Sequence, residues 1–240
     1  IVSVLGAAGF FRIGVAPELG GSGGCTADAI DAIARVAERS LTAAFVFWGQ
    51  RTFIEYLLQS PNAGLRESRL PALLTGEVAG ATGLSNAMKF LSGIESLSIA
   101  ATPAGAGWRL DGKLPWVTNL RRAGFAVAAA VEPSDGQPPA VVAFFGDTPG
   151  ITRTVDLQLL ALRGSNTAAI DIQGVASGAA ELIHADARSF LPRVRPGFLG
   201  LQCGMSIGLA RACIAAAKAS GSAVRAGLQS RIDALESGLA

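Results

Sequence analysis

The spacing of apolar residues changes twice along the sequence, and these changes constrain the fold more than any other feature. Residues 26–74 place apolar side chains at helical intervals, whereas residues 96–172 consist of short β-prone runs separated by turn residues. After Pro196 the helical intervals return. A helical spacing of apolar residues does not suit a strand, and a strand spacing does not suit a helix. The order of helical, strand-like and helical spacing therefore predicts an α+β protein. The expected domains are an N-terminal helical domain, a middle β domain and a C-terminal helical domain, at residues 1–76, 77–190 and 191–240.

Helices are expected in both outer parts. The predicted helices cover residues 26–39, Leu41–Leu58, Leu65–Leu74, Phe198–Ala219 and Val224–Leu239. Thr26 is placed to cap the first of them, and Pro61 ends the second. The fourth follows Pro192 and Pro196 and is apolar nearly all round, so we expect other elements to enclose it on several sides. Ser220–Ser222 predicts the turn before the fifth.

The middle part predicts short antiparallel strands. They cover Leu97–Ala100, Trp108–Leu110, Lys113–Val117, Phe125–Val131, Ala140–Phe145 and Ala168–Ile172. Asp111–Gly112 separates the second strand from the third, and both residue types tolerate positive φ, so this dipeptide predicts a tight hairpin. Short strands that alternate with turns in this way are typical of an antiparallel sheet or barrel.

Composition excludes several classes of protein. Hydrophobic residues make up 50% and charged residues 16% of the 240, a balance opposite to that of disordered chains. The net charge is only +2, and no dense run of Lys or Arg could follow a phosphate backbone, so we expect no nucleic-acid partner. Gly197–Ala210, the longest apolar stretch without a charge, falls short of the ~20 residues that cross a bilayer, so no membrane span is expected.

The beginning of the chain and its cysteines bear on location. No charged segment followed by an apolar core opens the sequence, so no secretory signal is predicted. Because the first residue is Ile1 and not Met, we expect either a fragment or only the ordered part of a longer chain. Cys25, Cys203 and Cys213 form no CxxC pair, and the single His184 cannot complete a metal cluster with them. We therefore expect reduced, buried thiols, a cytoplasmic protein and no metal site.

The residues taken alone point to no catalytic group. Gly20–Gly24 precedes a helix, but its spacing matches no phosphate-binding loop and no Lys follows it, so a flexible turn is the better interpretation. His184 lies in a polar segment without a GxSxG motif, which favours a surface histidine over a nucleophilic triad. No two carboxylates have a spacing that forces them together. The catalytic residues therefore stay unassigned.

Several short strings, taken in order, resemble the acyl-CoA dehydrogenase family of flavoproteins. Val15–Gly23 is similar to the family's Pro-Glu-x-x-Gly-Gly-x-Gly loop, and Gly76–Asn86 to the segment that enters its β domain and ends in a Leu-Thr-Glu turn. Gly112–Asn119 resembles its Gly-x-Lys-x-Trp-x-Thr-Asn strand. Leu162–Thr167 resembles its Gly-x-Arg-x-Ser-x-Thr string, and Ile207–Ala212 its first long bundle helix. The resemblance implies N-terminal helices, a middle antiparallel β-barrel domain and a shortened C-terminal helical bundle.

The resemblance also implies an FAD site between the β domain and the bundle. The residues implied to hold FAD are Thr82, Leu84, Ser85, Trp116, Val117 and Thr118. The family's tryptophan, here Trp116, packs on the flavin, and its threonine, here Thr118, hydrogen-bonds to it. Ser85 replaces the threonine of the Leu-Thr-Glu turn and Asn86 its glutamate. A serine hydroxyl can still hydrogen-bond to the pyrimidine edge of the ring.

Other family features are missing. The Gly-Ser-Asp string that follows the flavin turn is absent, with only Ser92–Gly93 nearby. The active-site glutamate has no counterpart, because its alternative position on the first bundle helix falls near Phe198 or Leu199. The Arg-x-x-Phe-Gly string is not visible around Ser220–Leu228. The catalytic base is therefore unknown.

The implied function is α,β-dehydrogenation of an acyl-CoA thioester in lipid metabolism, with FAD as the hydride acceptor. Two alternatives stay open. One is a flavin-dependent monooxygenase or oxidase on the same fold, which need not keep the glutamate, and the other is a non-catalytic partner subunit of a heteromeric acyl-CoA dehydrogenase. The expected ligand is an acyl-CoA or a related small molecule. Because apolar residues are abundant, we expect a homo- or hetero-oligomer that buries them.

Overall fold

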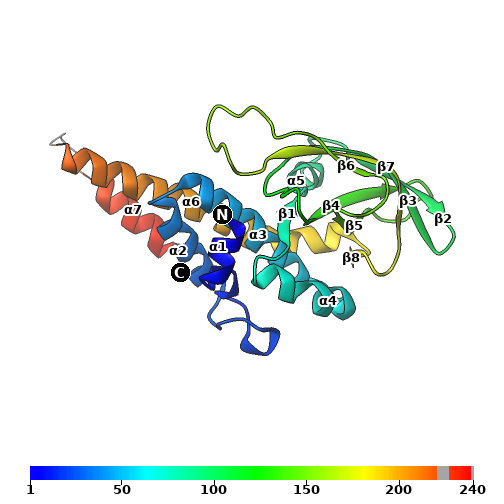
Figure 1. Cartoon of the computed structure of the whole chain (residues 1–240), viewed down its shortest axis with the longest axis horizontal. Helices are drawn as coiled ribbons and strands as arrows, with labels where there is room; N and C mark the ends of the chain where they lie inside the picture. The colour runs from blue at the N-terminus through cyan, green and yellow to red at the C-terminus, as the bar shows by residue number, and fades with distance from the viewer. Residues whose placement is uncertain (221–226, 239–240) are drawn as a thin grey trace.

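The computed structural model describes residues 1–220 and 227–238. Its helices are α1 Val2–Ala7, η1 Phe10–Arg12, η2 Pro17–Leu19, α2 Thr26–Ala37, α3 Leu41–Gln59, α4 Ala63–Leu74, α5 Ser85–Leu91, α6 Ala187–Ala219 and α7 Leu228–Ser237. Its strands are β1 Ala79–Thr82, β2 Ile99–Ala104, β3 Gly107–Val117, β4 Phe125–Pro133, β5 Ala140–Phe145, β6 Ile151–Arg153, β7 Ala168–Ser177 and β8 Leu182–His184. Most helices gather at one end of the molecule and the sheet at the other, where α5 lies beside the strands (Figure 1). The predicted α+β class, with the sheet between two helical parts, is confirmed.

Helix α3 lies at the centre of the helical part. It is buried continuously over Val46–Leu57, between α2, α6 and β1. An ion pair within this stretch joins Arg51 Nη1 to Glu55 Oε2 at 3.0 Å. The Arg51 guanidinium also donates to the carbonyls of Ile13 and Gly14, at 3.3 and 3.0 Å. The buried charge is thus satisfied on several sides, and it fixes the N-terminal loop to α3.

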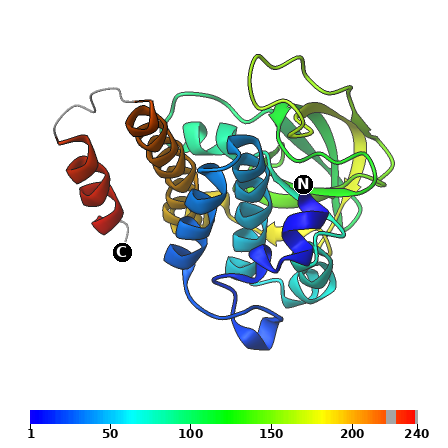
Figure 2. The same ribbon diagram turned by 60° about the vertical axis from the view of Figure 1, so that its left-hand side comes forward.

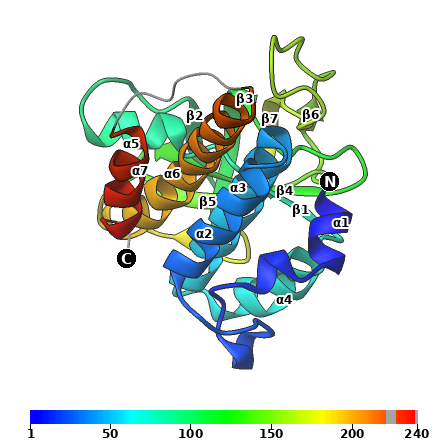
Figure 3. The ribbon, with the colours of Figure 1, turned by 90° about the vertical axis from the view of Figure 1, so that its left-hand side faces the viewer.

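Helices α2 and α6 lie side by side (Figures 2 and 3). Glycines at every fourth position of α6 allow this close approach, namely Gly200, Gly204 and Gly208. A Cβ at Gly208 would lie 2.0 Å from the carbonyl oxygen of Ala34, and one at Gly204 would lie 2.6 Å from that of Ile30. The two backbones therefore touch at Gly204 and Gly208, where no larger residue fits without moving one helix, whereas a Cβ at Gly200 would meet the end of the Ile30 side chain.

The prediction for the start of α6 is wrong. The helix begins at Ala187, and the carboxylate of Asp186 caps it by accepting from the N–H of Arg188 at 2.9 Å. Pro192 and Pro196 lie inside the helix rather than before it. Proline disfavours a helix interior through its missing donor and the clash of its ring. Here the apolar face of α6 is buried against α3, and this packing outweighs the local preference.

Beyond Phe198, helix α6 is less enclosed than its sequence predicts. Leu199 and Leu209 are each 43% exposed, and Cys203 and Cys213 are exposed free thiols, as is Cys25. The expectations of an enclosed helix and of buried thiols are therefore wrong for the described residues. By length and composition α6 could cross a bilayer, but core helices of soluble proteins pass the same test, so this is weak evidence of a span.

The first three predicted helices are confirmed with shifted ends, and α7 lies within the fifth, whose predicted ends Val224 and Leu239 are outside the described residues. The N-cap of α2 is Cys25 rather than Thr26, and the Asp28 carboxylate accepts from the N–H of Cys25 at 2.7 Å. Part of the predicted turn, Gly221 and Ser222, lies outside the described residues. The expected boundary at 76–77 falls between α4 and β1, and the one at 190–191 falls inside α6. The domain division itself stays a prediction.

Within the described residues, eight strands form one sheet. The order is β6-β7-β3-β2-β4-β5-β8, and β1 pairs with β4 outside this path. The pairs β1–β4 and β2–β4 are parallel, and the others are antiparallel. The strands β1, β6 and β8 and the short helices α1 and α5 were not predicted from the sequence.

The hairpin predicted at Asp111–Gly112 does not form. The chain continues through this dipeptide as β3, where Gly112 faces Ile99 of β2 on one side and Ile172 of β7 on the other. Asp111 Oδ1 accepts from the N–H of Gly174 at 2.7 Å, which attaches β7 at this point. Pairing on both sides overrides the local turn preference, and the tight turn between β2 and β3 lies at residues 105–106 instead.

Candidate functional site

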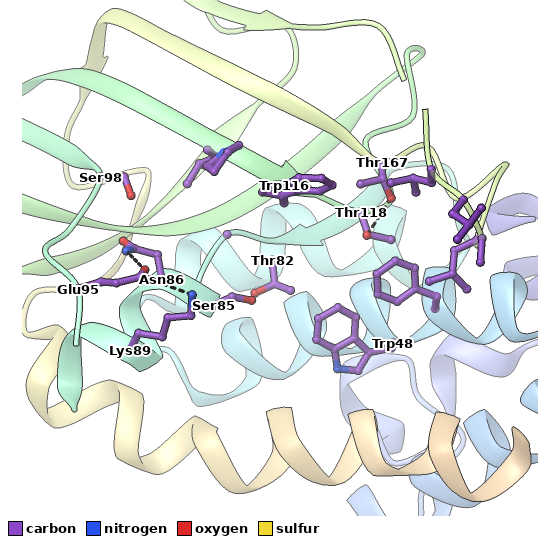
Figure 4. A pocket seen from close by; sticks show the side chains of 18 residues that line it. Trp48, Thr82, Ser85, Asn86, Lys89, Glu95, Ser98, Trp116, Thr118 and Thr167 are labelled. Carbon is purple, nitrogen blue, oxygen red and sulfur yellow. Dashed lines mark hydrogen bonds and ion pairs between the residues drawn. The ribbon is translucent and has the colours of Figure 1, made fainter. Parts of the chain in front are cut away.

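A cavity of about 590 Å³ lies between α3, α5, the end of β3 and the loop at residues 159–162. Figure 4 shows the side chains that line it. They form three kinds of surface: buried hydroxyls, a wall of aromatic and aliphatic side chains, and an exposed polar end. The cavity thus combines apolar walls with a few placed polar groups, as small-molecule sites do.

Threonine hydroxyls form one side of the cavity. Thr118 Oγ1 lies 3.0 Å from Thr167 Oγ1 (Figure 4). Thr167 Oγ1 in turn lies 2.7 Å from Ser165 Oγ. Thr82, at the end of β1, has its Oγ1 2.8 Å from the hydroxyl of Tyr56. The three threonines line the cavity, whereas Ser165 and Tyr56 are buried behind it. Each of these threonine hydroxyls is therefore held from within the protein.

A buried amide network sets the position of Thr118. Its neighbour Asn119 has φ of +67°, a conformation that is uncommon outside glycine. Asn119 Nδ2 donates to Gln50 Oε1 and to the Gly80 carbonyl, both at 2.9 Å. Gln50 Oε1 also accepts from the N–H of Gly80 at 2.6 Å. These bonds tie α3 to β1 and to the end of β3. Sequence reasoning missed Gln50, although a polar residue within a buried helix is a signal for such a bond.

Aromatic and aliphatic side chains form the second surface. The ladder between β3 and β7 is irregular between Leu114 and Val117, and here Trp116 turns outward with 68% of its surface exposed. Across the cavity, Phe45 and Trp48 of α3 stack with ring centroids 5.6 Å apart. Residues 159–162 complete this surface with three leucines and an alanine.

The polar end of the cavity carries a neutralised charge pair. Lys89 Nζ lies 2.6 Å from Glu95 Oε1, and Asn86 Nδ2 donates to Glu95 Oε2 at 3.0 Å (Figure 4). The hydrogen bond from Lys89, followed by that from Asn86, lowers the pKa of Glu95. Among the described lining residues, Lys89 and Glu95 are the charged ones. An ionised, paired Glu95 is a weak base, so no described lining residue presents a base suited to proton abstraction.

The structure divides the six residues expected to hold a cofactor. Four of them line the same cavity although they come from different elements: Thr82 from β1, Ser85 from α5, and Trp116 and Thr118 from the end of β3. Leu84 and Val117 do not line it, because their side chains are buried in the core. The contacts of all six with a cofactor stay a prediction.

The structure also places the other residues that were considered as catalytic groups. Phe198 is buried against Trp48, with ring centroids 5.4 Å apart, and Leu199 points away into solvent, so neither lines the cavity. His184 is half-buried rather than at the surface, and it stacks on Phe190 at 5.1 Å between ring centroids. Its Nδ1 accepts from the N–H of Asp186 at 3.0 Å. Within the described residues, no group of three metal-binding side chains occurs.

Known structures share this architecture. Butyryl-CoA dehydrogenase from Megasphaera elsdenii aligns with 99% of the chain at a TM-score of 0.79 and 22% sequence identity. The chain has the acyl-CoA dehydrogenase fold. The same fold occurs in a glutaryl-CoA dehydrogenase complex with glutaryl-CoA, which aligns with 90% of the chain at a TM-score of 0.78 and 21% identity. No protein-family model matches the chain.

The acyl-CoA dehydrogenase fold also occurs in proteins of other activities. The dibenzothiophene monooxygenase TdsC from Paenibacillus sp. A11-2 aligns with 88% of the chain at a TM-score of 0.72 and 16% identity. Further matching structures were solved with FAD or with FMN, at 18% and 20% identity. The chain spans 66% of butyryl-CoA dehydrogenase, 56% of glutaryl-CoA dehydrogenase and 54% of TdsC.

Proposed function

We propose that the chain is a flavin-dependent oxidoreductase and that the cavity binds the isoalloxazine ring of FAD. The observation that carries this proposal is that Thr82, Trp116 and Thr118 line the same cavity. The hydroxyls suit the nitrogen and carbonyl acceptors of the ring, and the exposed face of Trp116 suits its aromatic surface. A bound flavin would supply an acceptor for a hydride or for an electron pair.

The first candidate reaction is α,β-dehydrogenation of an acyl-CoA thioester or of a related small molecule. Its support is the apolar wall of Phe45, Trp48 and residues 159–162, which would exclude water from an acyl chain. The fold of butyryl-CoA and glutaryl-CoA dehydrogenases supports the same reaction. The base that removes the proton from the carbon next to the thioester is unassigned, because the described cavity offers only the paired Glu95.

The second candidate is an oxygen-dependent flavin monooxygenase or oxidase. What favours it is the same lack of an unpaired carboxylate among the described lining residues, since such a reaction need not abstract a carbon-bound proton. The likeness to a dibenzothiophene monooxygenase supports this candidate at the level of fold. The third possibility, a non-catalytic partner subunit, predicts a chain that lacks flavin or holds it only beside a second, full-length homologue.

A visible absorption spectrum separates these candidates. The purified protein is reconstituted with FAD and then mixed anaerobically with a panel of acyl-CoA thioesters. Bleaching of the flavin by a thioester supports dehydrogenation. A flavin that stays oxidised, and that consumes oxygen only when an external reductant and a non-thioester substrate are present, supports the monooxygenase. A folded chain that takes up no FAD contradicts both and favours the partner subunit.

The wall residues provide a direct test of the flavin site. The double variant Trp116→Ala/Thr118→Ala removes the exposed ring and the end of the hydroxyl chain, so we expect it to lose most of the FAD that the wild type retains. Trp108→Ala is the matched control, because Trp108 lies on the same strand but does not line the cavity. Circular dichroism verifies that both variants fold. Equal FAD content in wild type and double variant would overturn the assignment of these two residues.

A further inference from the structure

Tyr56 lies directly behind the cavity wall. It is fully buried in α3 and does not line the cavity, whereas Thr82 does (Figure 4). The oxygen atoms of the two hydroxyls are 2.8 Å apart. The backbone N–H of Leu84 also donates to Thr82 Oγ1, at 3.3 Å. Thr82 Oγ1 therefore has two hydrogen-bond partners on the protein side.

The protons in this group can be placed by counting donors and acceptors. A phenol has one proton to donate, and among the described residues the hydrogen-bond partner of Tyr56 is Thr82. Burial raises the pKa of Tyr56 above its ordinary value of 10.0, so the phenol keeps its proton at neutral pH. A buried donor without an acceptor is strongly disfavoured. Tyr56 therefore donates to Thr82, Leu84 donates to the same oxygen, and the hydroxyl proton of Thr82 is left to point into the cavity.

We propose that Tyr56 is a positioning residue that makes Thr82 a hydrogen-bond donor to an acceptor atom of the bound flavin. This inference rests on the proposed flavin site and adds to it a residue that does not touch the cavity. Hydroxyls in a chain polarise one another, so Thr82 donates more strongly while Tyr56 donates to it. Loss of the Tyr56 hydroxyl should then weaken flavin binding and alter the absorption of the bound ring.

The second group of hydroxyls, which ends at Thr118, can be counted in the same way. Ser165 is buried, and its hydroxyl lies within hydrogen-bond distance of Thr167 Oγ1, which is bonded to Thr118 Oγ1. If Ser165 donates its proton to Thr167, the chain of donors runs outward and ends at Thr118. Both groups of hydroxyls then present protons to a ligand, which suits a ring that carries acceptors on its edge.

A double-mutant cycle tests the role of Tyr56. FAD is titrated into the apo forms of the wild type, Tyr56→Phe, Thr82→Val and the double variant, and both the Kd and the visible spectrum of the bound flavin are recorded. We expect each single variant to raise the Kd about threefold to tenfold and to shift the flavin absorption bands. The double variant should resemble Thr82→Val, because Tyr56 acts through Thr82.

Thr52→Val is the matched control. Thr52 is on the same helix and is fully buried, and its hydroxyl has no hydrogen-bond partner among the described residues. It should leave both the Kd and the spectrum unchanged. If Tyr56→Phe kept the wild-type spectrum and FAD affinity, the inference would be overturned while the flavin site stayed intact. Additive effects of the two substitutions in the double variant would have the same meaning. Failure of the folded wild type to bind FAD would instead overturn the flavin site and this inference together.

Discussion

At the residue scale, Tyr56 is the most informative side chain, because it is the only tyrosine in the sequence. Its ring packs edge-on against Phe190, with centroids 6.4 Å apart, and its hydroxyl reaches Thr82. Burial disfavours the phenolate and raises the pKa of Tyr56 above 10.0, and the bond to Thr82 opposes this only in part. The ionisation of one side chain thus reports on the packing behind the cavity.

We expect the tyrosinate absorbance of the native protein to appear only well above pH 10.0, the ordinary pKa of the group. The unfolded chain ionises at the ordinary pKa, so the contribution of Tyr56 to stability is complete below that pH and is lost as the pH rises above it. A spectrophotometric titration of native and urea-unfolded protein measures the difference. Ionisation of native, folded protein at the ordinary pKa would contradict the burial of Tyr56.

The site was predictable from sequence only in part, and the reason lies in neighbouring residues. The string around Trp116 and Thr118 was found by resemblance, and both residues reach the cavity. Val117 lies between them in the same string but faces the core, because successive side chains of a strand point to opposite faces. A string identifies a segment that meets a ligand, whereas the face that each residue takes depends on strand pairing.

At the element scale, the contact between α2 and α6 depends on the absence of side chains. Gly204 and Gly208 of α6 lie against carbonyl groups of α2. Glycine in a helix interior costs about 0.5–1 kcal/mol relative to alanine, so its presence here reflects the close approach of the helices. The sequence pattern showed an apolar helix but not which of its faces would be covered.

Replacing Gly208 with alanine should destabilise the protein. The new Cβ would lie 2.0 Å from the Ala34 carbonyl oxygen and 2.6 Å from the Ala37 Cβ, so the helices must separate. We expect a loss of about 1–3 kcal/mol in the free energy of unfolding, measured by urea denaturation. Gly64→Ala in α4 is the control, because its Cβ would meet only ordinary contacts and should be neutral or stabilising. Equal stability of both variants would refute the close contact.

Local sequence preference failed wherever an element gained from long-range pairing. Asp111–Gly112 has the composition of a turn, yet it is paired by β2 on one side and β7 on the other. Pro192 and Pro196 disfavour a helix, yet they lie in α6 because its buried face packs on α3. In both cases the deciding partners lie far along the chain, where a local pattern carries no information.

At the scale of the whole molecule, apolar side chains remain uncovered at the cavity and along α6. Leu160 is 97% exposed and Trp116 is 68% exposed, and the Leu199 and Leu209 side chains of α6 are partly exposed as well. Large apolar patches are uncommon on the surface of monomers. This exposure supports the expectation of a homo- or hetero-oligomer, which stays a prediction.

We expect light scattering to give a mass of at least a dimer at micromolar concentration. Leu160→Asp, which places a charge on the most exposed leucine, should shift the distribution toward the monomer if this region forms the contact. Val155→Asp, at a residue that is also exposed but does not line the cavity, is the matched control. A monomeric mass for the wild type at that concentration would contradict oligomerisation.

The general architecture was accessible from sequence, while the cavity was not. The order of helices, sheet and helices follows from periods that can be counted locally. The cavity joins Trp48, Thr82, Trp116 and Thr167, which are far apart in sequence. Their meeting depends on how α3 lies against β1 and how β3 pairs with β7, and on buried amides such as Gln50.

The irregular ladder at the end of β3 makes chain length, as well as residue identity, a determinant of the site. Leu114 faces Ile170 and Val117 faces Ala168. Two residues of β3 therefore lie between these pairs, but only one residue of β7. The surplus lets both Pro115 and Trp116 border the cavity before Val117 returns to the core. Deleting Pro115 alone would remove the surplus and leave one outward position in place of two, so Trp116 would move to the place that Pro115 now holds although every remaining residue type is unchanged.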